Sequence, residues 1–269
     1  MESSTTMQYR QVQKDYNNSE TNITTNARTI ANIFLRPATL YDSRQISGAM
    51  VAGFLDNEVY GDYLHPYRNK YPEDYRRMFE RLIRGAIMKP TKRVFVSATT
   101  TNDTKLKTPK GEIITGVAIW ERLGPKGSST IRTQESHLHR LHRLYIQAVD
   151  GFSSYVRPDR SVCRENREKF YSHAPNYMNQ FWVGQREESW YLDTLVVHPD
   201  YQGTGIGRAL VMGTGVEWAR RDGVSASVIA SHVGNGFYDR LGFVDVGSAA
   251  TGVLEGMQGG KIKFLEGHL

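Results

Sequence analysis

The stretch WYLDTLVVHPDYQGTGIG, from Trp190 to Gly207, decides the fold of this 269-residue chain. It opens with a β-rich run, Trp190–Val197, and closes with glycines at every second position, the first two being Gly203 and Gly205. The aliphatic run predicts a buried, central strand. Glycines let backbone N–H groups approach an anion closely, and a helix starts at this turn. The turn therefore suits a diphosphate.

The residues after the turn support a strand–turn–helix unit. Apolar or small residues recur at helical spacing from Ile206 to Val216, and the pattern stops at Gly223. A short strand, Ser225–Ser231, is expected next. It is followed by GNGFYDRLGF, in which Gly242 signals the end of a second helix, and one last strand is expected after it.

Two other phosphate-binding turns compete for the same glycines. A dinucleotide-binding turn needs G-x-G-x-x-G, but its third glycine would fall on Arg208 or Leu210, depending on where the count starts. A nucleotide triphosphate loop needs G-K-[ST], which does not follow. Both alternatives therefore fail on the residues themselves.

With these blocks in place, the chain resembles the GNAT superfamily of acyl-CoA N-acyltransferases. Q-G-T-G-I-G, 202–207, is similar to its Q/R-x-x-G-x-G/A loop, and F-Y-D-R-L-G-F, 237–243, is similar to its aromatic-Tyr-x-x-x-Gly-Phe signature. The resemblance covers residues 189–247 and, more loosely, 34–123. It implies an α/β fold with a central mixed sheet flanked by helices, and acetyl-CoA as the cosubstrate.

The resemblance also implies which residues bind the cofactor. Many relatives carry Asn seven residues before the signature tyrosine, where this chain has Ser231, whose hydroxyl can still hydrogen-bond. The other residues expected to contact coenzyme A lie at the strand end and in the turn: Leu195, Val196, Val197, Gln202, Gly203, Thr204, Gly205, Ile206, Gly207 and Arg208.

The expected chemistry is direct attack of a neutral primary amine on the thioester, within a ternary complex. Tyr238 occupies the position of the family's general-acid tyrosine, and a phenol of pKa near 10 stays protonated at neutral pH. A base is also needed, because deprotonating an amine of pKa near 10.4 at pH 7 costs roughly 4 to 5 kcal/mol. We favour Asp193, with Glu188 and Glu121 as rivals.

Acceptor recognition is expected between the first two strands, again by resemblance. Tyr60, Asp62 and Tyr63 lie there, with His65 and Tyr67 close by in sequence. Their aromatic walls and polar tips suit an amine-bearing small molecule.

The rest of the chain predicts one domain, 33–269, behind a polar N-terminal arm, 1–32. Pro37 suits an edge strand, Asp42 or Ser43 can cap a helix through Phe54, and a charged helix spans 73–88. The segments 94–99 and 113–122 predict a hairpin.

Residues 124–188 form an insertion that matches nothing known. Apolar residues at helical spacing predict a long helix over 134–152, and 153–188 are either a lid or a surface excursion. The histidines of this helix, His137, His139 and His142, do not share one face, so no metal site is expected.

Composition restricts the class of protein. The net charge of +6 arises from interleaved charges of both signs, which does not indicate nucleic-acid binding. No apolar run approaches the roughly 18 residues of a membrane span. The single cysteine, Cys163, excludes an internal disulfide and fits a cytoplasmic protein.

Alternatives to a small-molecule N-acetyltransferase stay open at this stage. They are a protein lysine or N-terminal acetyltransferase, a ping-pong enzyme that uses Cys163, and a non-catalytic CoA-binding regulator. The sequence settles neither the acceptor nor the oligomeric state.

Overall fold

Residues 33–100, 111–127, 129 and 135–266 are described by the computed structural model of the chain. The chain divides into two units, Met1–Ile30 and Ala31–Leu269. The predicted N-terminal arm, 1–32, lies outside the described residues, as does the tip of the predicted hairpin, 101–110.

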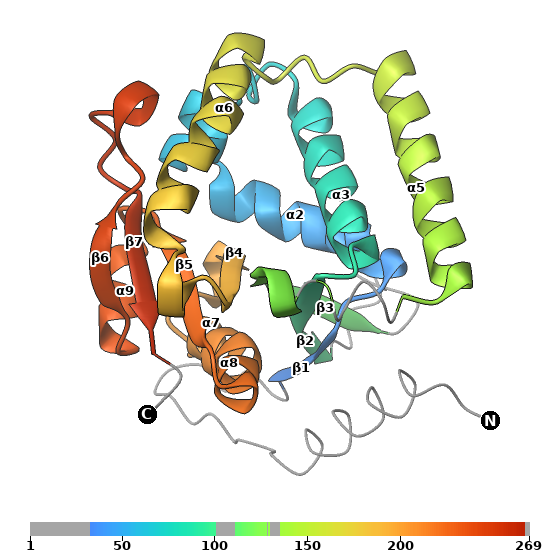
Figure 1. Cartoon of the computed structure of the whole chain (residues 1–269). Helices are drawn as coiled ribbons and strands as arrows, with labels where there is room; N and C mark the ends of the chain where they lie inside the picture. The colour runs from blue at the N-terminus through green and yellow to red at the C-terminus, as the bar shows by residue number, and fades with distance from the viewer. Residues whose placement is uncertain (1–32, 101–110, 128, 130–134, 267–269) are drawn as a thin grey trace, which may run out of the picture. The chain divides into compact units, whose positions relative to one another are not determined.

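A mixed sheet forms the centre of the second unit (Figure 1). Within the described residues it has seven strands in the order β1-β2-β3-β4-β5-β7-β6. The α/β fold with a helix-flanked mixed sheet is thereby confirmed. The strands are β1 (Ile33–Pro37), β2 (Lys92–Thr100), β3 (Glu112–Leu123), β4 (Ser189–Val197), β5 (Ser225–Ala230), β6 (Val244–Ser248) and β7 (Lys261–Leu265).

The strand order confirms two expectations and corrects one. β4 lies at the middle of the sheet and β1 at its edge, as the aliphatic run and Pro37 predicted. The sequence predicted one strand after the last helix, but two are present, because β7 inserts between β5 and β6. β4 and β5 are the parallel pair, and the other neighbouring strands are antiparallel.

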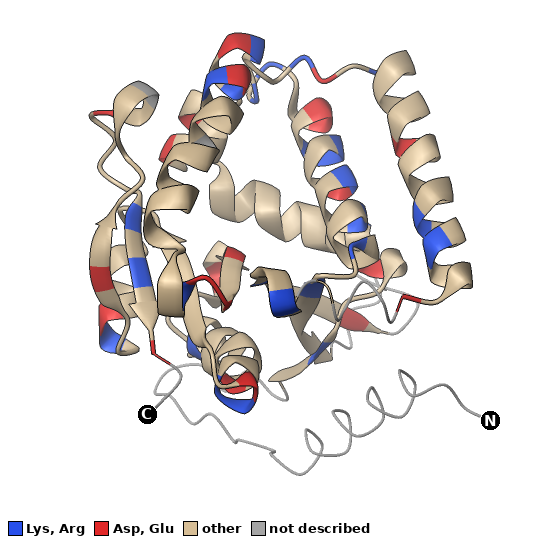
Figure 2. Ribbon diagram, viewed as in Figure 1, with Lys and Arg blue, Asp and Glu red and all other residues tan. Residues whose placement is uncertain are grey.

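Two helices cover one face of the sheet. They are α2 (Ser43–Phe54) and α3 (Pro72–Met88), close to the predicted bounds. Ile46 and Met50 of α2 and Phe79 of α3 pack with strand residues in one buried cluster. In Figure 2, α3 carries charges of both signs, whereas α2 is nearly free of them. Asp42 does not cap α2 with its side chain and binds Arg36 instead.

The other face is covered by the helix that follows the glycine turn. It runs as α7 (Ile206–Leu210), a π-helical turn η6 (Val211–Val216) and α8 (Glu217–Asp222), and it ends at Gly223 as predicted. A Cβ at Gly215 would collide with the ring of Trp120 on β3. A glycine there lets the helix lie close against the sheet.

The insertion folds into two helices, α5 (His137–Val156) and α6 (Arg164–Phe181). α5 corresponds to the predicted long helix. α6 was not predicted, because the residues it buries are aromatic and dispersed among polar residues, so they give no aliphatic period. The remaining helix, α9 (Asn235–Arg240), carries the aromatic signature.

Candidate functional site

The centre of β4 is distorted at Asp193. Leu192 pairs with Trp120 of β3 and Thr194 pairs with Ile119, so Asp193 is an extra residue in β4, a β-bulge. The pairing between β4 and β5 stops at Leu192. Beyond the bulge, β4 pairs with β3 and with no other described strand, and the strand end that leads into the glycine turn separates from β5.

A short chain of charges surrounds the bulge. The Asp193 carboxylate lies 2.6 Å from Nζ of Lys92 on β2, and Lys92 lies 3.4 Å from Glu121 on β3. Glu121 also forms an ion pair with Lys89, whose Nζ lies 2.5 Å from Oε1 of Glu121. Burial works against the charge of Lys92, but Asp193 and Glu121 together raise its pKa above the usual lysine value. Lys92 is therefore a fixed cation beside Asp193 at neutral pH.

Four tyrosines lie within the field of the Asp193 carboxylate. For each of them burial raises the pKa of the phenol, and the negative charge of Asp193 raises it further. They come from three elements: Tyr60 from the π-helical turn η2 (Glu58–Tyr63), Tyr171 and Tyr177 from α6, and Tyr191 from β4. All four phenols are consequently neutral at neutral pH.

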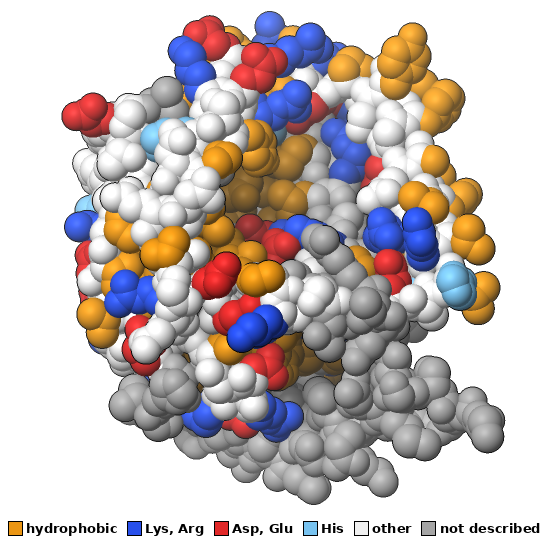
Figure 3. Space-filling view, viewed as in Figure 1, with side chains coloured by type: hydrophobic (Ala, Val, Ile, Leu, Met, Phe, Trp, Pro, Cys, Tyr) orange, Lys and Arg blue, Asp and Glu red, His pale blue; other side chains and the backbone are white. Residues whose placement is uncertain are grey.

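The space-filling view shows where these elements leave room. Figure 3 shows a hollow at the centre of this face, with hydrophobic side chains deep inside it and acidic and basic side chains at its lower edge. By comparison with Figure 1, α6 stands on one side of the hollow, α3 on the other and β4 below. The hollow therefore opens over the central strand, between the insertion and the first helices.

The glycine turn has the conformation that the sequence predicted. Gly203 and Gly205 have φ of 76° and 87°, in the left-handed region that favours glycine. Among the described residues, the amides of Gly205, Ile206, Gly207 and Arg208 donate to no backbone carbonyl, since the first helical bond runs from Ala209 to Gly205. Four adjacent N–H groups at a helix start are free to bind an anion.

Side chains hold this turn in place without blocking it. Nε2 of Gln202 donates to the carbonyl of Val197 at 3.1 Å, and Oγ1 of Thr204 donates to the carbonyl of Tyr201 at 2.6 Å. A Cβ placed on Gly203 would meet nothing within 4 Å, so the outer side is open. Arg208 is exposed and forms no ion pair with any described residue.

The second signature packs directly on the first. A Cβ at Gly207 would touch the ring of Phe237 at 3.4 Å, so Phe237 fills the space that this glycine leaves. Phe237 thus has a packing role. Tyr238, the other aromatic residue of the signature on this helix, carries the hydroxyl that can donate a proton. Tyr238 is buried, its ring lies against Phe237 and Phe243, and burial raises its pKa above the usual tyrosine value.

Two polar residues at the start of α9 and just before it differ in whether they have a hydrogen-bond partner. The Ser231 hydroxyl accepts a hydrogen bond from the amide of Gly234 at 3.2 Å, which fixes the turn after β5. Oδ1 of Asn235 is shielded from solvent and has no hydrogen-bond partner among the described residues. A buried acceptor without a partner calls for a donor from outside the chain. The free amides of the turn and this oxygen together fit coenzyme A, which carries a diphosphate and amide N–H groups.

The other residues predicted for the site differ in their bonding partners and in their link to Asp193. Asp62 is bonded to Arg68 at 2.7 Å and is mostly exposed, while the backbone of Tyr63 accepts a bond from Asn166 of α6. Glu188, a rival base, caps the amides of Lys126 and Gly127. Of the three acceptor residues predicted from η2, Tyr60 is the one whose phenol is influenced by Asp193.

The sequence analysis missed Lys92 and the tyrosines of α6. Lys92 lies more than a hundred residues before Asp193 in the chain and meets it through strand pairing. Tyr171 and Tyr177 belong to a segment assigned no structure. The one signal available was the aromatic spacing Phe170, Tyr177, Phe181, which is helical but sparse.

Comparison with known proteins agrees with the motifs. Residues 175–245 match the family model described as Acetyltransferase (GNAT) domain. A protein named "Acetyltransferase" from Stachybotrys chartarum is 28% identical over 217 residues, covering 79% of this chain and 81% of that protein.

Two solved structures are similar to this chain to slightly different degrees. The crystal structure of arylalkylamine N-acetyltransferase 2 from Aedes aegypti has a TM-score of 0.50 at 14% identity, covering 88% of this chain and 100% of that one. That of a histone acetyltransferase HPA2 and related acetyltransferase from Corynebacterium glutamicum has a TM-score of 0.49 at 17% identity, covering 87% and 96%. Residues 175–245 are thus similar to a GNAT acetyltransferase domain, and the chain shares the fold of the Aedes aegypti enzyme.

Two kinds of feature are absent from the described residues. No group of three or more His, Cys, Asp or Glu side chains is arranged to hold a metal ion in the part of the chain that the structure describes. Within that same part, no helix combines the length and apolarity of a membrane span.

Proposed function

We propose that this protein transfers the acetyl group of acetyl-CoA to a primary amine of a small molecule, by direct attack within a ternary complex. The observation that carries the proposal is the placement of Asp193. Its carboxylate sits on a bulge of the central strand, within electrostatic range of four tyrosines and at the point where β4 leaves β5. A carboxylate among aromatic rings attracts an amine as its cation.

Lys92 gives this carboxylate a second role. Asp193 alone would raise the pKa of the bound ammonium group, and the neighbouring Lys92 cation reduces that rise, so the neutral, nucleophilic amine is easier to form. Asp193, 2.6 Å from Lys92, can then accept the proton directly or through water. The pair thus both holds the amine and helps to deprotonate it.

Acetyl-CoA supplies the acetyl group as a thioester. The free amides of Gly205 to Arg208 bind its diphosphate, and the unpartnered oxygen of Asn235 accepts a hydrogen bond from its amide arm. As the new N–C bond forms and the C–S bond breaks, the Tyr238 hydroxyl donates its proton to the departing sulfur. Because burial raises the pKa of Tyr238, this proton is present at neutral pH.

The placement of α6 supports a small acceptor over a protein chain. Hydrogen bonds hold both ends of α6: Asn166 near its start bonds to Tyr63, and Trp182 just after its end bonds to Ser227. The helix therefore forms a fixed wall on one side of the hollow. A side-walled hollow over β4 accepts a compact amine more readily than an extended polypeptide (Figure 3).

The test is an acceptor screen with purified chain, acetyl-CoA and a thiol reagent. Aryl-alkyl amines, polyamines, amino sugars and lysine peptides are compared, and the expected result is thiol release with a small amine and intersecting initial-rate lines. Parallel lines, or loss of turnover in Cys163→Ser, would indicate an acyl-enzyme instead. Thiol release with lysine peptides alone would assign a protein substrate.

Calorimetric titration with CoA separates the remaining alternative. If CoA binds and no amine in the panel releases thiol, the chain is a CoA-binding regulator and the catalytic proposal is wrong. If CoA does not bind at all, the assignment of the glycine turn is wrong as well.

A further inference from the structure

Helix α5 carries an apolar stripe on its solvent side. Its large members, Leu138, Leu141, Tyr145, Phe152 and Tyr155, are between 64% and 87% exposed, and Ala148 is exposed as well. These six residues, the α5 stripe, are separated alternately by three and four positions along the chain. That spacing keeps them on one side of the helix and is the pattern by which one helix packs lengthwise on another.

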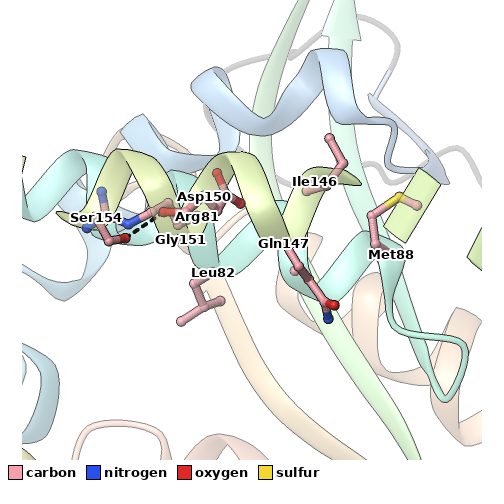
Figure 4. A pocket seen from close by; sticks show the side chains of 9 residues that line it. Arg81, Leu82, Met88, Ile146, Gln147, Asp150, Gly151 and Ser154 are labelled. Atoms are coloured by element: carbon pink, nitrogen blue, oxygen red, sulfur yellow. Dashed lines mark hydrogen bonds between the residues drawn. The ribbon is translucent and has the colours of Figure 1, made fainter. Parts of the chain in front are cut away.

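The opposite side of α5 faces α3 but makes a loose contact. A groove of about 400 Å³ lies between the two helices, lined on the α5 side by Ile146, Gln147 and Gly151 (Figure 4). No residue of α5 is fully buried. The main polar link is Arg84 of α3 to Asp150 of α5. The apolar side chains of α5 therefore point largely away from the body that the helix rests on.

The stripe is large enough to need a partner. Three aromatic side chains exposed to this degree would each remove roughly 100–200 Å² from solvent on burial. Together they supply a large part of the roughly 800 Å² per partner of a standard protein interface. Leu144, Val149 and Val156 flank the stripe, are also partly exposed and widen it. Figure 3 shows the hydrophobic side chains gathered along the outer side of α5.

Charge along α5 distinguishes between possible partners. His137, Arg140 and His142 lie in its first turns, and Glu135 there is already bonded to Arg143 and His139. The last turns carry no cation before Arg157, which is the C-cap of the helix. Two such helices side by side in parallel would bring their basic first turns together, whereas an antiparallel pair keeps those turns about a helix length apart.

We propose that α5 is a self-association helix: two copies of this chain pack their α5 stripes antiparallel about a two-fold axis. The partner is a second copy because the stripe has the helix-pairing period and because antiparallel pairing keeps the basic first turns of the two copies apart. A membrane surface would favour basic residues along the whole length of the stripe, but none lies between Arg143 and Arg157.

Sedimentation of the full chain tests the proposal. At micromolar concentration the protein should sediment at twice the chain mass of 30.5 kDa. Phe152→Glu places a charge in the stripe and should give the monomer, with an unchanged circular dichroism spectrum. The matched control, Gln147→Glu, adds the same charge on the groove side of the same helix and should remain a dimer.

Cross-linking tests the direction of pairing in a Cys163→Ser background. A mixture of chains carrying Leu138→Cys and Tyr155→Cys should form a disulfide between the two, whereas Leu138→Cys alone should not. Efficient cross-linking of Leu138→Cys with itself would mean a parallel pair and overturn the arrangement.

Two results would overturn the proposal as a whole. One is a wild-type chain that stays monomeric at about 100 μM; the other is a Phe152→Glu chain that still dimerises. Flotation with anionic vesicles is run in parallel. If the wild-type chain is a monomer that floats with the vesicles and Phe152→Glu does not float, the stripe is assigned to a membrane surface. None of these measurements depends on acetyl transfer, so they are independent of the proposed function.

Discussion

The two sides that meet at β4 are encoded differently. The proposed donor side, residues 195–208 and 231–243, holds its shape through local conformation: left-handed glycines, a helix start and an aromatic packed on a glycine. The proposed acceptor side, the π-helical turn 58–63 and the helix 164–181, is held by contacts between distant segments. A site for a shared cofactor can be fixed locally, while a site for a particular acceptor depends on how the whole chain packs.

The largest expected effect separates the two sides by function. Tyr238→Phe removes the proton donor of the donor side, and kcat should fall by about 10²- to 10⁴-fold, the usual contribution of general acid catalysis. CoA affinity by calorimetry should stay within about twofold, because the ring and its packing on Phe237 are kept. An unchanged kcat would remove Tyr238 from the mechanism.

Asp193→Asn tests the point where the two sides join. We expect kcat/KM for the amine to fall about 10- to 100-fold and the limb of the pH–rate profile that depends on the base to shift. Glu188→Gln is the matched control, since Glu188 caps the amides of Lys126 and Gly127 and should leave the profile unaltered. If the profile of Asp193→Asn is the same as that of the wild type, the base lies elsewhere.

Gly205→Ala should affect the donor side alone. At a φ of 87°, a Cβ adds strain of roughly 1–2 kcal/mol, and relief of that strain would turn the free amides away from the diphosphate. CoA binding should weaken by about tenfold in calorimetry. Gly48→Ala, in α2 with nothing near its Cβ, is the control and should bind CoA normally. Equal affinity in both variants would contradict the role of the turn.

Tyr171→Phe should affect the acceptor side alone. The variant keeps the ring but loses a hydroxyl influenced by Asp193 and Lys92, so the KM for the amine should rise by about 2- to 10-fold. The dissociation constant for CoA should not change. A rise in the CoA constant without a rise in the amine KM would place Tyr171 on the donor side.

The smallest expected effect concerns pH and stability. Burial lowers the pKa of His65 below 6.5, opposed by Asp159 and reinforced by Arg167 and Arg68. The stability contributed by its neutral form is complete above the unfolded pKa near 6.5 and is lost as pH falls towards the lowered folded value.

Urea unfolding between pH 7.5 and 5 checks this expectation. The free energy of unfolding should fall by at most about 1.4 kcal/mol per pH unit on account of His65. His65→Asn should flatten that slope. Because His65 is bonded to Ser161, the loss should affect the acceptor side before the glycine turn. An identical slope in both proteins would contradict the expectation.

Much of the fold could be read from the sequence, and the reason differs from element to element. The strand before the turn, the glycine turn itself and the helix ending at Gly223 follow from residue types whose preferences act over a few positions. The edge position of β1 followed from Pro37. Helix α6 did not follow, because its buried residues are sparse aromatics that pack against residues from several strands, β4 to β7.

The sequence by itself determined the donor side, because a positive φ, a free helix start and an aromatic signature are properties of short segments. Only the tertiary structure decided the acceptor side. The bulge at Asp193 comes from strand register, Lys92 reaches it from another strand, and Tyr171 comes from a helix of the insertion. Lys92 and Asp193 are about a hundred residues apart, and Tyr171 lies in a segment without a regular apolar pattern. Whether these groups meet therefore depends on how the whole chain packs.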